Sequence, residues 1–151
     1  MNEQLTPAIK DFNRVVENAE ILLSISRATE LQEQALEDLK QAALQLKDEK
    51  DFAVGQANED YANGLLGCEC VTAALSAELK MWMLLKQERP EEAWDELVVA
   101  QMATSDALRA HANFGHLGPH VKRLEHIEEI VFPPQVFLSS GMIVDFEECS
   151  I

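Results

Sequence analysis

Apolar residues recur at helical spacing along most of the chain and are densest between residues 61 and 85. At about 100° per residue, one broad stripe of this segment is apolar throughout: Tyr61, Leu65, Cys68, Leu75, Leu79 and Met83. Val71, Trp82 and Leu85 widen the stripe on one flank, and leucine, alanine and methionine fill much of the opposite side. Because a helix that is apolar almost all round is normally enclosed by other helices, we expect this segment to be the central helix.

The N-terminal half has a second helical pattern, which begins with Thr6 as a capping residue and Pro7 as the first helical residue. Apolar residues recur every three or four positions from just before this start: Leu5, Ile9, Phe12, Val16, Ala19 and Leu23. The pattern weakens over residues 24–29, where serine or threonine could cap a second start. Nothing in the sequence decides whether residues 29–87 form one helix or two, because Gly55 alone is a weak helix stop.

A narrow apolar stripe follows residue 29 on an otherwise polar segment: Leu31, Ala35, Leu39, Ala42 and Leu46. A stripe of this width is more typical of a coiled-coil seam than of the core face of a bundle. We therefore expect the chain to be a homo-oligomer, most simply a dimer, that associates through its N-terminal half.

Pro90, followed by Glu91 and Glu92, marks the start of another helix, which extends to about Ala112. Its larger apolar residues fall on one face, with alanines on the flanks: Trp94, Leu97, Val98 and Leu108. Because the connection before Pro90 is short, this helix and the central helix should form an antiparallel hairpin.

Residues 113–119 are predicted to be a loop, and a short last helix should carry Val121, Leu124, Ile127 and Val131. After the prolines at 133 and 134, residues 136–138 and 142–144 have the pattern of a small β-hairpin. The predicted fold class is therefore all-α, an antiparallel bundle of long helices. Residues 1–131 would be the helical domain, and residues 132–151 an extended or hairpin tail.

The net charge of −15 is large for 151 residues and is spread along the chain. Direct nucleic-acid binding is not expected, since clustered lysine and arginine are missing. Glu69, Glu78 and Lys80 interrupt the central apolar segment before about 18 uncharged residues accumulate, so no membrane span is predicted. Three cysteines without a disulfide framework, together with the absence of a signal-peptide pattern, indicate the cytoplasm.

All four histidines lie between positions 111 and 126, and His116 and His120 have the spacing of two metal ligands on one helical face. Gly118 and Pro119 lie between them and would break that helix. Neither Glu-x-x-His nor His-Glu-x-x-His occurs. Cys68 and Cys70 would point in nearly opposite directions from one helix and cannot share a metal ion.

Pairs of acidic residues three or four positions apart on a helix could bind Mg²⁺, as in all-α nucleotide pyrophosphohydrolases. The candidates are Glu92 with Asp95 or Glu96, and Glu125 with Glu128 or Glu129. Such pairs are hardly more frequent than random placement of 27 acidic residues would produce. The sequence names no catalytic and no cofactor-binding residue.

The C-terminal pattern of strand, turn and strand ends in Glu148, Cys149, Ser150 and Ile151. It resembles the start of a zinc-knuckle or zinc-ribbon module, in which a hairpin delivers the first cysteine of a Cys-x-x-Cys motif. The resemblance implies that Cys149 is a zinc ligand in a longer natural chain that supplies the remaining ligands. Within these 151 residues one thiolate is far short of the four ligands of a structural zinc site.

The function expected from these patterns is a helical interaction or assembly module that oligomerises or holds a protein partner. Two alternatives remain open. One is a Mg²⁺-dependent enzyme that uses the acidic helices, and the other is an acidic mimic of nucleic acid that occupies a nucleic-acid-binding protein.

Overall fold

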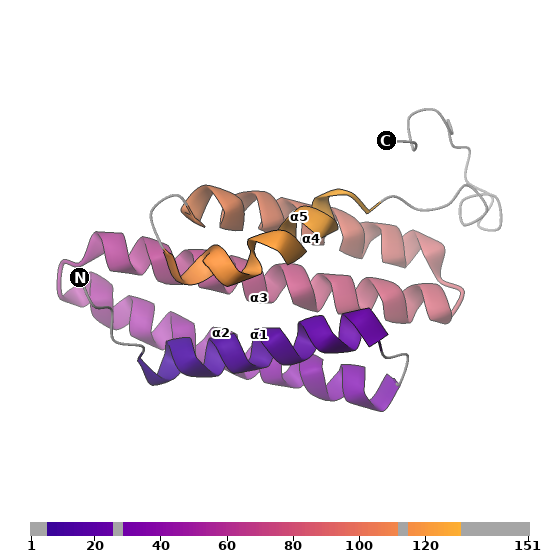
Figure 1. The fold of residues 1–151 in the computed structure, drawn as a ribbon, viewed down its shortest axis with the longest axis horizontal. Helices are drawn as coiled ribbons and strands as arrows, with labels where there is room; N and C mark the ends of the chain where they lie inside the picture. Colours follow the sequence, from indigo (N-terminus) through magenta and orange to yellow (C-terminus); the bar gives the residue numbers. More distant parts are fainter. Residues whose placement is uncertain (1–5, 26–28, 112–114, 131–151) are drawn as a thin grey trace.

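The computed structural model of the chain describes residues 6–25, 29–111 and 115–130. Within them the chain is all-α, as the periodicity predicts, and its long helices pack antiparallel (Figure 1). The elements are α1 (Pro7–Ile25), α2 (Thr29–Gly55), α3 (Glu59–Lys86), α4 (Pro90–His111), the 3-10 helix η1 (Gly115–His120) and α5 (Val121–Glu128). The expected C-terminal hairpin lies outside the described residues.

The segment 29–87 forms two helices, separated by a tight turn at residues 56–58. Ala57 has a φ of 58°, in the left-handed region. Its N–H donates to the Val54 carbonyl oxygen, and the Asn58 N–H donates to that of Ala53. This is the Schellman arrangement that closes helix C-termini. The Asn58 side chain then caps α3 by accepting a hydrogen bond from the Tyr61 N–H at 3.3 Å.

The turn between α3 and α4 repeats this arrangement. Glu88 also has a φ of 58°, its N–H donates to the Leu85 carbonyl oxygen, and the Arg89 N–H donates to that of Leu84. Pro90 is the first residue of α4, as predicted. The two helices form the expected antiparallel hairpin.

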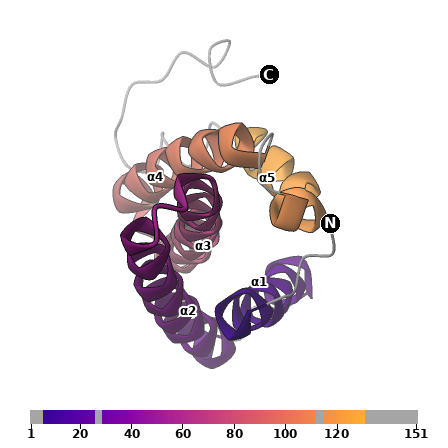
Figure 2. The same ribbon diagram turned by 90° about the vertical axis from the view of Figure 1, so that its left-hand side faces the viewer.

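Helix α3 is the centre of the bundle, since it contacts α1, α2, α4, η1 and α5 (Figure 2). Most of its predicted stripe is fully buried, and Tyr61 and Met83 are half-buried at its ends. The enclosure is incomplete, however. Leu66 and Trp82 remain 47% and 39% exposed, so α3 has an outer face that other helices leave uncovered.

The narrow stripe of α2 packs inside the bundle, which corrects the expectation of an intermolecular seam. Ala35, Leu39, Ala42 and Leu46 are fully buried in the main hydrophobic core, and α2 packs against both α1 and α3. Leu31 alone is exposed. A stripe of leucine and alanine is enough here because two helices of the same chain cover it. The α2 stripe therefore no longer supports a homo-oligomer, which remains an untested prediction.

The buried face of α4 also differs from the prediction. It consists mainly of small residues: Ala93, Leu97, Ala100, Thr104 and Ala107. Trp94 and Val98, which were placed on the core face with Leu97, are 37% and 40% exposed. Small side chains bring α4 close to α3, and this closeness leaves the larger residues at the rim of the contact.

Residues 115–119 of the predicted loop belong to η1 (Gly115–His120), and α5 follows directly from it. Leu124 and Ile127 are buried as expected, and Val131 lies outside the described residues. The Gln101 side chain of α4 donates to the backbone oxygens of Ile127 and Ile130 at 3.2 and 3.1 Å. This amide satisfies carbonyls at the C-terminus of α5 and holds α5 against α4.

Candidate functional site

His120, one of the predicted metal ligands, is buried against α1. Its Nδ1 lies 3.3 Å from Glu20 Oε1 and its Nε2 lies 3.2 Å from Asn13 Oδ1. Its ring meets the ring of Phe12 edge to face, with centroids 5.2 Å apart. These contacts use both ring nitrogens to join η1 to α1.

The structure does not describe the side chains of the other two candidate ligands. His116 lies in η1 with a side chain outside the described set, and Cys149 also lies outside the described residues. Among the described residues, no three His, Cys, Asp or Glu side chains are grouped so that they could hold a metal ion.

The acidic pairs proposed for Mg²⁺ lie on exposed helix surfaces. Glu92 is engaged by Arg89, whose Nε donates to its Oε1 at 2.8 Å. Glu125, Glu128 and Glu129 are exposed on and just after α5. Glu92 lines a small pocket with Arg89, Pro90 and Glu91, but neither Asp95 nor Glu96 lines it, and no three acidic side chains of the described residues are grouped to hold a metal ion.

A site that the sequence analysis did not predict is organised by Glu78, which is fully buried on α3. Arg123 of α5 grips this carboxylate with two donors: Nε donates to Oε1 at 3.1 Å, and Nη2 donates to Oε2. The indole N–H of Trp82 donates to Oε2 at 3.0 Å. A charge taken out of water is costly unless it is paired in this way. Glu78 consequently fixes both an arginine and a tryptophan.

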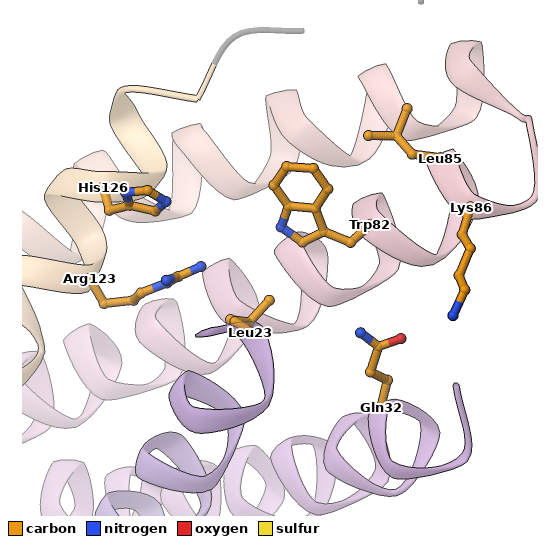
Figure 3. Close-up of a pocket in the computed structure, with 7 residues that line it drawn as sticks. All are labelled: Leu23, Gln32, Trp82, Leu85, Lys86, Arg123 and His126. Carbon is orange, nitrogen blue, oxygen red and sulfur yellow. The ribbon is translucent and has the colours of Figure 1, made fainter. Parts of the chain in front are cut away.

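Next to this cluster is a cavity of about 640 Å³ where four helices meet (Figure 3). Its lining residues come from α1, α2, α3 and α5: Leu23, Gln32, Trp82, Leu85, Lys86, Arg123 and His126. Of these seven described lining residues three are basic residue types and none is acidic, although acidic residues outnumber lysine and arginine 27 to 12 in the chain. The described part of the lining thus combines apolar side chains with the cationic side chains of Lys86 and Arg123.

A second feature is the outward face of α4, which we call the α4 surface: Trp94, Val98, Val99 and Met102. These side chains are between 37% and 65% exposed. Spacings of three and four residues make them neighbours along the helix. They are four of the eleven large apolar side chains exposed in the described part of the chain, and they lie within nine residues.

Burial raises the pKa of both thiols on α3. The increase is larger for Cys68, which is fully buried and lies near the negative charges of Glu49 and Glu69. For Cys70, burial is again the main cause, followed by the nearby charge of Asp106. Thiols held in the protonated form are poor nucleophiles and poor metal ligands.

No protein-family model, curated protein or solved structure matches the chain. Among the described residues, no helix combines the length and apolar character needed to cross a membrane.

Proposed function

We propose that the chain is an interaction module that holds a basic, amphipathic segment of a protein partner on the α4 surface. The observation that carries this proposal is the concentration of exposed apolar side chains on one helix of an otherwise strongly charged molecule. Clustered apolar exposure of this kind is typical of interaction sites. Tryptophan and methionine are also enriched at protein interfaces.

The charges around the α4 surface support a basic partner. Helix α4 carries five acidic residues and one arginine: Glu91, Glu92, Asp95, Glu96, Asp106 and Arg109. Arg109 pairs with Asp106, and Arg89, just before the helix, pairs with Glu92. Lysine or arginine beside an apolar stripe of the partner would meet the remaining carboxylates. A second copy of this chain would bring another −15 charge and is the less favourable occupant.

The rival functions draw less support from the geometry. A Mg²⁺-dependent reaction needs carboxylates that converge, and the candidate pairs are separate and exposed. An acidic mimic needs no apolar stripe, so that function leaves the α4 surface without a role.

The test uses a labelled amphipathic peptide of leucine and lysine, about 20 residues long, as a stand-in for the partner helix. A matched peptide of leucine and glutamate is the charge control. We expect the lysine peptide to bind, and the Val98→Ser/Met102→Ser variant to bind it about tenfold or more weakly. The control variant is Phe52→Ser/Val54→Ser, since both side chains are exposed on α2.

Fluorescence anisotropy would measure the peptide affinities, and circular dichroism would confirm that both variants fold. Equal weakening in the two variants, or equal binding of the two peptides, would overturn the proposal. Sedimentation that shows a dimer broken by the α4 substitutions would assign the surface to a second copy instead.

A further inference from the structure

We propose that the cavity between α1, α2, α3 and α5 binds a small organic monocarboxylate, whose apolar body packs against Trp82. This site is separate from the α4 surface and does not depend on the function proposed for it. Three independent observations support it: an amide that lines the cavity without a hydrogen-bond partner among the described residues, an arginine with an unused edge, and cationic residues in the described lining of an acidic protein.

Gln32 provides the first observation. Its side chain is only 4% exposed, and no residue in the described part of the chain forms a hydrogen bond with it. Figure 3 shows its amide directed from α2 into the space between Trp82 and Lys86. Because the amide lines the cavity and has no partner among the described residues, its hydrogen bonds must be made to whatever occupies the cavity, water or a ligand. A ligand oxygen in the cavity would accept a hydrogen bond from this amide.

The second observation is the unused edge of the Arg123 guanidinium. Glu78 engages Nε and Nη2, and no described residue engages Nη1. The edge formed by Nη1 and the second hydrogen of Nη2 is therefore available, and two parallel donors match the two oxygens of a carboxylate. Because Glu78 holds the guanidinium in place, little conformational entropy would be lost on binding.

The balance of charge favours a monoanion. Among the described residues at the cavity, Lys86 and Arg123 each carry one positive charge and Glu78 carries one negative charge, so the formal sum of these three groups is +1. A phosphate dianion would exceed this charge and would need more donors. The walls formed by Leu23, Leu85 and the Trp82 ring suit an apolar body. A volume of about 640 Å³ is in the usual range for small-molecule sites.

The test uses naphthalene-2-carboxylate and its uncharged carboxamide as probes, with decanoate as an aliphatic carboxylate of similar size. Isothermal titration calorimetry would measure affinity. In a Trp94→Phe background, the indole N–H resonance of Trp82 would report where the ligand binds, since the chain has two tryptophans. We expect the carboxylate to bind at least about tenfold more tightly than the carboxamide and to shift the Trp82 resonance. The ratio of naphthoate to decanoate affinity would distinguish an aromatic from a lipid-like natural ligand.

Gln32→Leu and Lys86→Gln should each weaken naphthoate binding by about fivefold or more, since each removes one polar contact. The matched control is Lys80→Gln, which makes the same change at an exposed lysine of α3 outside this cavity. Arg123 is left intact in these tests, because its loss would leave the buried Glu78 carboxylate without its ion-pair partner. Equal affinity for carboxylate and carboxamide, unchanged binding in both variants, or no binding of either carboxylate at millimolar concentration would overturn the proposal.

Discussion

A Cβ atom on Gly67 would lie 2.6 Å from the Cβ of Ala110 and 2.9 Å from Cδ1 of Leu117. The hydrogen at this position is therefore what allows α3 to approach α4 and η1. Ala110 has no flexible side chain that could turn away, so a larger residue must push the helices apart. We expect Gly67→Ala to lower the free energy of unfolding by about 1–3 kcal/mol, although alanine is the better helix former.

Gly55→Ala is the matched control, because nothing lies within 4 Å of the Cβ that it would add at the end of α2. It should leave stability unchanged or raise it by up to about 1 kcal/mol. Urea unfolding of both variants would measure the difference. Similar midpoints for the two would contradict the close packing of α3 on α4.

Because Glu78 and Arg123 form a buried ion pair, truncation of either partner should greatly lower the free energy of unfolding. Arg123→Ala would leave the fully buried Glu78 carboxylate unpaired and should cost about 3–5 kcal/mol. Arg109→Ala removes a pair whose side chains are 76% and 53% exposed, and should cost about 1 kcal/mol or less. Chemical denaturation would compare the two variants.

The double variant Glu78→Leu/Arg123→Leu should recover most of the stability lost in Arg123→Ala, since apolar residues often replace a buried ion pair without loss. Recovery would mean that the fold does not require the pair. A double variant as unstable as Arg123→Ala would instead make the pair essential to the packing of α5.

The parts of the fold that the sequence predicts depend on local chemistry. Pro7 and Pro90 are the first residues of α1 and α4, and the spacing of Leu124 and Ile127 gives the buried side of α5. The break between α2 and α3 was not predictable in the same way. Its left-handed residue is Ala57, where the Schellman turn usually has glycine.

Features that depend on contacts between distant parts of the chain were harder to predict from the sequence. The buried face of α4 is built mainly from alanine, which gives little contrast in a hydrophobic pattern, so Trp94 and Val98 were placed inside. The cavity brings together Gln32, Trp82 and Arg123 from three helices, and no sequence spacing relates them. The local indication was Glu78, which is one of three charged residues within the central apolar segment, with Glu69 and Lys80.

The burial of the α2 stripe predicts the outcome of a charge placed in it. Leu39 is fully buried among residues of α1 and α3, so Leu39→Glu should unfold the monomer rather than divide a dimer.

Leu75→Ala and Leu79→Ala in the same core should each lower the free energy of unfolding by about 2–5 kcal/mol. Glu37→Ala, on the exposed side of α2, should cost about 0.5 kcal/mol or less.

Circular dichroism with sedimentation would separate the two outcomes for Leu39→Glu. Loss of most helical signal is the expected result. A folded, monomeric Leu39→Glu protein derived from a dimeric parent would place the stripe between chains after all.

The raised pKa values of Cys68 and Cys70 predict that both thiols resist alkylation while the chain is folded. Iodoacetamide reacts with the thiolate, so labelling at pH 8 should be slow at Cys70 and slower at the fully buried Cys68. A Cys149→Ser background removes the third cysteine from the measurement. Mass spectrometry of labelled peptides, with and without urea, would give the protection of each site.

The same shifts predict how stability changes with pH. A thiol in the unfolded chain ionises near its ordinary pKa of 9.0, whereas folding holds Cys68 in the protonated form well above that value. The folded state therefore binds more protons than the unfolded state once the pH passes about 9, and stability must fall as the pH rises further. Urea midpoints at pH 8 and pH 9.5 should show this decrease. The decrease should be smaller in Cys68→Ala, which has no thiol to ionise at that position. An equal decrease in the parent and in this variant would assign the pH dependence to other groups.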